Sequence, residues 1–175
     1  MKSVNCIFRG WRSTDVWIAR DVPERNRNAR IPASKRTTWH RYMKSSGNTS
    51  ADADLKEPKD AELLMKRYQV DVAGAYHAIQ QVLGEEFSQK KGTILVTGGG
   101  FALYPMDEFL PLSMDKAALR AMCIALHNKL KEQDVYVGTL TVTDSIVPGG
   151  KCDPALLAED FWKMYVERGE CEMMH

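Results

Sequence analysis

The 175-residue sequence lacks several features that would assign a protein to a class directly. It has no apolar run of about 18 residues, so we expect no membrane-spanning helix. It also lacks the apolar core of a secretory signal peptide. Its cysteines form no Cys-x-x-Cys pair and have no metal-ligand spacing with histidine, which argues against a disulfide framework or a metal site: Cys6, Cys123, Cys152 and Cys171. Widely spaced free thiols are typical of a reducing compartment, and we expect a cytoplasmic protein.

Acidic residues are scarce in the first part of the chain. Residues 1–50 hold 11 Lys+Arg and 3 Asp+Glu, a charge of +8, whereas the rest holds 13 and 20, a charge of −7. The Arg- and Ser-rich composition loosely resembles a mitochondrial transit peptide, although Asp15, Asp21 and Glu24 argue against one. Arginines and aromatic residues together could also contact nucleic acid, but such a segment is more often a solvated arm. We therefore expect no nucleic-acid binding.

Regular periodicity is equally scarce in residues 1–59, which we interpret as a basic, irregular N-terminal segment. Short strands are indicated at residues 4–8 and 15–19, and residues 45–54 have the small polar composition of a linker. The composition of the whole segment favours loose attachment to the rest of the chain.

A strong helical pattern begins at residue 60. Apolar residues recur at spacings of three and four, which predicts one face of a long helix over residues 60–90: Leu64, Tyr68, Val72, Ala75, Ile79, Val82, Leu83 and Phe87. A β-branched run at 93–97 follows and predicts a strand buried on both faces, ended by three glycines at 98–100. The apolar loop 98–111 is expected to line a pocket or an interface. A helix at 112–131 carries Lys116.

Another inner strand is indicated at residues 135–142. Asp153 and Pro154 mark a helix start, with Asp as the N-cap and Pro at the first helical position. The order from residue 60 is helix, strand, helix, strand, helix, which predicts a parallel α/β region over residues 60–167 and a tail at 168–175. Ligands in such sheets bind beyond the carboxyl ends of the strands, which here means near the glycines and Lys116.

Three motifs in this region, in their order and spacing, resemble the short-chain dehydrogenase/reductase family. Val-Asp-Val-Ala-Gly at 70–74 resembles the Asn-Val-x-Gly run of the family's central helix. Gly-Thr-Ile-Leu-Val at 92–96 resembles the strand that leads to the catalytic serine. Leu-Ser-Met-Asp-Lys-Ala-Ala-Leu at 112–119 resembles the Tyr-x-x-x-Lys-Ala-Ala-Leu helix. The resemblance implies a Rossmann-like, doubly wound, three-layer α/β fold and oxidoreductase chemistry with NAD or NADP.

The chemical residues of that family are mostly replaced. Lys116 matches the lysine that holds the nicotinamide ribose and assists catalysis, so it is the candidate catalytic and cofactor-binding residue. The tyrosine position is Leu112, the serine position is Gly99 and the asparagine position is Asp71. Neither leucine nor glycine can exchange a proton, and general acid/base catalysis is typically worth ~10²–10⁴-fold. Tyr104 is the nearest tyrosine that could act as a substitute donor.

The family's first half has no counterpart in this sequence. Residues 1–60 contain Gly10 and Gly47 as their glycines, so the Gly-x-x-x-Gly-x-Gly turn that cradles the cofactor pyrophosphate is absent. We therefore expect a partial Rossmann-like domain with its N-terminal half missing or irregular, and an impaired NAD(P)-dependent oxidoreductase or a fragment of one. The resembling family dimerises through the corresponding helices, so we expect a homo-oligomer through helices 60–90 and 112–131. The alternative function is a non-catalytic interaction module that keeps these dimerising helices.

Overall fold

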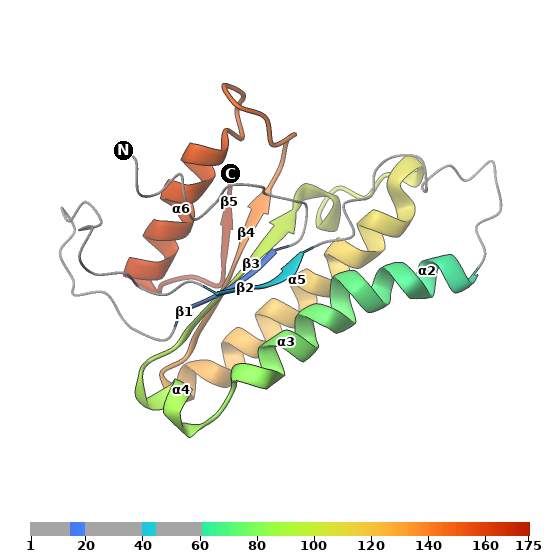
Figure 1. Cartoon of the computed structure of the whole chain (residues 1–175). Helices are drawn as coiled ribbons and strands as arrows, with labels where there is room; N and C mark the ends of the chain where they lie inside the picture. Colours follow the sequence, from blue (N-terminus) through green and yellow to red (C-terminus); the bar gives the residue numbers. More distant parts are fainter. Residues whose placement is uncertain (1–14, 20–39, 45–60) are drawn as a thin grey trace.

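The fold is a five-stranded sheet with helices on both faces (Figure 1). The computed structural model describes residues 15–19, 40–44 and 61–175. The strand expected at 4–8 and the linker expected at 45–54 lie outside these ranges. The strand order is β2-β1-β3-β4-β5, and β1 is antiparallel to both of its neighbours.

The central and C-terminal strands are parallel. Strand β3 (Thr93–Gly99) pairs with β4 (Tyr136–Val142), and β4 pairs with β5 (Glu172–Met174). Both β3 and β4 are buried along their whole length, as their apolar runs predict. Two expectations are corrected. The first two glycines continue β3 instead of ending it, and the expected tail contains strand β5, because its backbone finds partners on β4.

The N-terminal strands run differently from a parallel Rossmann sheet. Strand β1 (Asp15–Ala19), expected from the sequence, is antiparallel to β3, with Val16 opposite Val96 and Ala19 opposite Thr93. Strand β2 (His40–Lys44), which the sequence did not indicate, is antiparallel to β1. The start of β1 therefore lies beside the carboxyl end of β3. An antiparallel strand thus borders the parallel part of the sheet.

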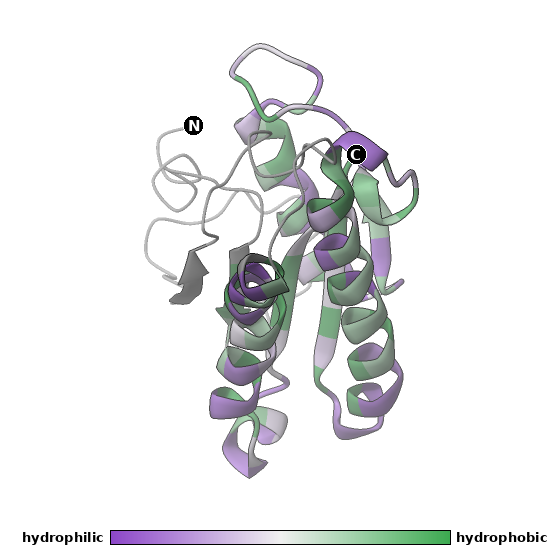
Figure 2. Ribbon diagram, turned by 90° about the vertical axis from the view of Figure 1, so that its right-hand side faces the viewer, coloured by the Kyte–Doolittle hydropathy of each residue, from purple (hydrophilic) through white to green (hydrophobic). Residues whose placement is uncertain are grey.

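One face of the sheet is covered by two helical rods that lie side by side (Figures 1 and 2). The first comprises α2 (Ala61–Tyr68), a π-helical turn η2 (Gln69–Ala73) and α3 (Gly74–Val82). The second is α5 (Leu110–Leu130), close to the expected 112–131. Between β3 and α5 lie two 3-10 turns, η3 (Gly100–Ala102) and η4 (Asp107–Phe109).

The long helix expected over 60–90 is corrected in two ways. It ends at Val82, because Leu83 is extended and Gly84 follows, and a separate short helix α4 (Glu85–Gln89) comes next. The π turn also rotates the buried face, since one extra residue in a turn shifts the face by about 100°. Tyr68, expected to be buried, is 44% exposed, whereas Arg67 is 7% exposed.

The other face is covered by α6 (Pro154–Glu167), which begins as expected: Asp153 is the N-cap and accepts a hydrogen bond from the Ala155 amide at 2.7 Å. Successive side chains of a strand point to opposite faces of the sheet, so the helices on the two faces bury alternate residues of β3. Ile94 and Val96 pack toward α3 and α5, whereas Leu95 packs toward α6. In the described residues, no helix combines the length and apolarity needed to cross a membrane.

Candidate functional site

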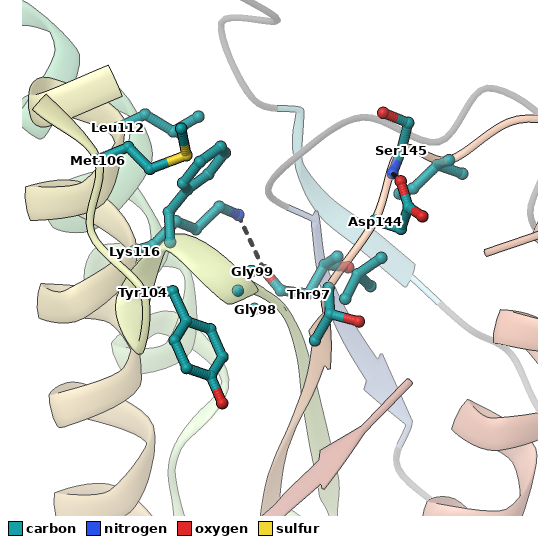
Figure 3. A pocket seen from close by; sticks show the side chains of 14 residues that line it. Thr97, Gly98, Gly99, Tyr104, Met106, Leu112, Lys116, Asp144 and Ser145 are labelled. Atoms are coloured by element: carbon teal, nitrogen blue, oxygen red, sulfur yellow. Dashed lines mark hydrogen bonds between the residues drawn. The ribbon is translucent and has the colours of Figure 1, made fainter. Parts of the chain in front are cut away.

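A cavity of about 600 Å³ opens at the carboxyl ends of β3 and β4, where ligands bind in α/β sheets. Four segments line it: the end of β3, the loop after it, the first turns of α5, and the chain that leaves β4. Figure 3 shows two facing walls, one carrying Tyr104, Met106, Leu112 and Lys116, and the other carrying Asp144 and Ser145. The volume is in the range of small-molecule sites, ~300–1,000 Å³.

Lys116 is the central polar residue of the first wall. Its side chain is 3% exposed, and its Nζ donates a hydrogen bond to the Thr97 carbonyl at 3.3 Å. The aliphatic stem lies against Gly99, where an added Cβ would be 3.1 Å from Lys116 Cε and 3.2 Å from its Cδ. The predicted position of Lys116, at the sheet edge beside the glycines, is therefore confirmed. Its catalytic and cofactor-binding roles stay predictions.

The three replaced positions do not all meet at the cavity. Leu112 and Gly99 line it together with Lys116. Asp71 is not among the lining residues and lies buried in the π turn η2, 3% exposed. A leucine and a glycine therefore stand beside the lysine amine, where the resembling family has two hydroxyl groups.

Asp71 belongs to a buried charged cluster between η2 and α5, whose other members are Arg67 and Asp115. Arg67 Nε and Asp115 Oδ2 are 3.6 Å apart, and both side chains are less than a tenth exposed. Burial, and after it the nearby Asp71 carboxylate, raises the pKa of Asp115 to about 6, although Arg67 and Lys116 oppose the shift. Asp71 Oδ1 is buried without a hydrogen bond. Since Asp115 adjoins Lys116 in the chain, this cluster supports the helix turn that carries the amine.

The loop after β3 lines the cavity, as its apolar character predicts. Phe101, Tyr104 and Met106 all face it, and Phe101 stacks on Phe109 with ring centroids 5.1 Å apart. Tyr104 lies at the rim and is 66% exposed, so its hydroxyl is not held inside the cavity. Sequence reasoning missed the facing wall formed by residues 142–146. The place of these residues in the sequence could have predicted this wall, because they follow the carboxyl end of β4, the parallel neighbour of β3.

The described residues fit one end of a nicotinamide dinucleotide and not the other. Lys116 is the residue that would hold the ribose next to the nicotinamide, and the cavity is large enough for that half of the cofactor. The pyrophosphate needs backbone amides at a glycine-rich turn into a helix. In the described ranges no strand, glycine turn and helix of that kind lies next to β3, because the neighbouring β1 is antiparallel. The same ranges hold no cluster of three or more metal-ligating side chains.

No protein-family model and no curated protein matches this sequence. Solved dehydrogenase structures do match the fold. The bulky-bulky ketone specific alcohol dehydrogenase from Comamonas testosteroni superposes with a TM-score of 0.57 at 14% identity, over 66% of this chain and 47% of that one. A short-chain dehydrogenase from Sphingobium yanoikuyae, in complex with NADPH, gives 0.57 at 14% identity over 66% and 50%. A 4-hydroxyisoleucine dehydrogenase complexed with NADH and succinate gives 0.55 at 12% identity over 66% and 57%.

The matched part spans about half the length of these dehydrogenases. Sequence identity at this level establishes the fold alone. The chain therefore has the fold of part of a short-chain dehydrogenase/reductase domain, mixed α/β and Rossmann-like.

Proposed function

We propose that this chain is a short-chain dehydrogenase/reductase-like protein whose cavity takes the nicotinamide-ribose end of NAD or NADP, with its own hydride-transfer chemistry impaired. The observation that carries the proposal is the buried Lys116 amine at the carboxyl end of β3, flanked by Leu112 and Gly99. The lysine would donate hydrogen bonds to ribose hydroxyls. The cofactor, when bound, would supply the hydride. No proton donor stands at position 112.

The dehydrogenases of similar fold support a nicotinamide cofactor, since two of them were solved with NADPH or NADH. The missing pyrophosphate cradle limits the expected affinity. Backbone amides at a helix N-terminus normally hold that group, and here the ribose end would carry the binding. We therefore expect binding at micromolar to millimolar concentration. A cytoplasmic location, inferred from the wide spacing of the cysteines, belongs to the same proposal.

A fluorescence titration with NADH and NADPH tests cofactor binding. Wild type should give a saturable change, and Lys116→Met should weaken it about tenfold or more, because a charge-assisted hydrogen bond is worth ~1.5–3 kcal/mol. Lys129→Met, at an exposed position near the end of the same helix, is the matched control and should bind like wild type. Absence of any change at millimolar cofactor, with the protein folded by circular dichroism, would overturn the proposal.

A second candidate function is a non-catalytic interaction module, favoured by the outward face of α5. This face is largely apolar and exposed, which is unusual for a solvated helix: Leu110, Met114, Ala117, Ala121 and Ala125. Met65, Tyr68 and Tyr76 add exposed apolar surface on the neighbouring rod. We infer that a second copy of the chain covers this surface through the two rods.

Sedimentation of wild type and two variants tests the association. Ala121→Glu on α5 should convert a dimer to a monomer, because it buries an unpaired charge at the interface. Leu156→Glu, at a 45% exposed apolar position on the opposite face, should leave the dimer intact. A wild-type protein that stays monomeric at high micromolar concentration contradicts this second function and leaves the cofactor proposal standing.

A further inference from the structure

The Lys116 amine combines two properties that are rare in one side chain. It is almost completely buried, with 3% of the residue exposed, and it belongs to the lining of a cavity that opens to the outside. Figure 3 shows the amine on the side of the opening between the two walls, with its hydrogen bond to Thr97 directed to the end of β3. A ligand in the cavity therefore meets the amine directly.

Position 99 determines where this amine lies. Because Gly99 has no side chain, the lysine stem passes directly over the strand end, and a Cβ there would be 3.1 Å from Cε. Leu112, one turn earlier on α5, adds an apolar side chain to the same wall and offers no hydroxyl. The amine is thus the reactive group that this wall presents.

The remaining lining residues define the class of ligand. Apolar side chains dominate the lining: Phe101, Met106, Leu112, Val142 and Ile146. Among the described residues that line the cavity, Lys116 is the one cation and Asp144 the one anion. These two charges balance among the described lining residues. A neutral, largely apolar molecule is therefore a second class of ligand that these walls can take.

We propose that the Lys116 amine forms an imine with an apolar aldehyde or ketone bound in this cavity. Lysine amines in desolvated, apolar pockets are the nucleophiles of Schiff-base chemistry. This activity goes beyond the proposed cofactor binding and does not require it.

The step is balanced without an oxidant or a reductant. The ammonium first releases a proton to water, and the nitrogen lone pair then attacks the carbonyl carbon. A C–N bond forms while the C–O π electrons move to oxygen. The nitrogen loses one proton as the oxygen gains one, which gives the carbinolamine. A second proton lets that oxygen leave as water while the nitrogen lone pair forms the C=N bond, and the nitrogen then releases its last proton. Solvent at the cavity mouth supplies and accepts these protons.

Reductive trapping tests the proposal. The full chain is incubated with a low concentration of benzaldehyde and sodium cyanoborohydride, and the benzylated lysines are identified by peptide mass mapping. We expect Lys116 to be modified at least tenfold faster than Lys66 and Lys90, which lie in exposed ion pairs on α2 and α4. Burial alone predicts the opposite order. Preference for the exposed lysines, with Lys116 unmodified, overturns the proposal.

Two controls establish the origin of the selectivity. Wild type unfolded in urea should lose the preference for Lys116, since the cavity is then absent. Lys116→Arg keeps the positive charge and should lose the fast-reacting site while the labelling of Lys66 is unchanged. A preference that persists in urea overturns the proposal, because it would then reflect local sequence and not the cavity.

Repeating the trapping with NADH separates this proposal from cofactor binding. Suppression of Lys116 labelling by NADH supports both, because both use the same amine. Labelling that NADH leaves unchanged supports imine formation and counts against cofactor binding at Lys116. Failure of labelling in a protein that binds NADH refutes imine formation alone.

Discussion

Lys116 and Gly99 are packed against each other so closely that the glycine cannot gain a side chain without moving the lysine. An added Cβ at position 99 would lie 3.1 Å from Lys116 Cε and 3.4 Å from its Cγ. The family resemblance leads one to expect a serine at position 99. The glycine there does more than remove a hydroxyl group, because it also leaves room for the Lys116 side chain. The lysine stem occupies the space, and the amine reaches the Thr97 carbonyl because of it.

Gly99→Ala should lower the free energy of unfolding by about 1 kcal/mol, since overpacking of this kind typically costs ~1–3 kcal/mol and the lysine stem can yield part of the way. Urea unfolding measures the change. Gly84→Ala is the matched control, because a Cβ there has no neighbour within 4 Å and the backbone is extended. Equal effects of the two substitutions would show that the Lys116 contact carries no free energy.

Asp115 should make stability depend on pH. Burial and the Asp71 carboxylate raise its pKa in the folded protein from 3.8 to about 6. A raised pKa means that the folded state binds the proton more tightly. The stabilisation is therefore complete below about pH 4 and is lost as the pH rises through 6. The difference in free energy of unfolding between wild type and Asp115→Asn should therefore change by roughly 1–3 kcal/mol between pH 4 and pH 8. Parallel pH profiles would contradict the assignment.

Arg168 should be the most sensitive residue outside the cavity. Its guanidinium donates hydrogen bonds to the carbonyls of Lys91, Gly92 and Asp134, the last at 2.5 Å, and so joins the amino ends of β3 and β4 to the end of α6. Arg168→Ala leaves these acceptors without the arginine and should cost about 2–4 kcal/mol in thermal or urea unfolding. Lys163→Ala, an exposed change on α6, should stay within about 0.5 kcal/mol.

The short strand β5 should depend on one ion pair. Arg120 Nε and Nη2 both donate to the Glu172 carboxylate, at 2.9 and 2.7 Å to the nearest oxygens, and Thr141 Oγ1 donates to the same group at 2.6 Å. Arg120→Met should speed amide exchange at His175, which donates to the Thr141 carbonyl, by about fivefold for a loss of ~1 kcal/mol. Lys90→Met, which removes an exposed pair on α4, should not change that amide.

Sequence periodicity was sufficient for the elements with long, uninterrupted patterns. The buried run of β3, the α5 helix with its lysine, β4, and the Asp153 cap of α6 all follow from local residues. The π turn could not be predicted from local residues. It shifts the buried face by one residue, although the spacing of the apolar residues still indicates a continuous helix. Arg67 rather than Tyr68 is buried for that reason.

Pairing between strands that are far apart in the sequence explains the remaining differences between the predicted and the observed elements. Residues 172–174 have no period of their own and become a strand through the backbone of β4 and the Arg120 ion pair. Strand β2 depends in the same way on β1. For the candidate site, the resemblance identified Lys116, Leu112 and Gly99 together. The facing wall at Asp144 and Ser145 carried no motif, because loop residues are placed by the strand before them.

Methionine-methyl NMR with NADPH tests the central claim, that the cavity beside Lys116 is a cofactor site, most directly. Met106 lines the cavity, Met65 is 67% exposed on α2, and Met164 is a buried residue of α6. We expect the Met106 methyl resonance to shift saturably with NADPH, the other two to stay in place, and the shift to disappear in Lys116→Met. An unshifted Met106 at millimolar NADPH, or a shift at Met65 instead, would contradict the claim.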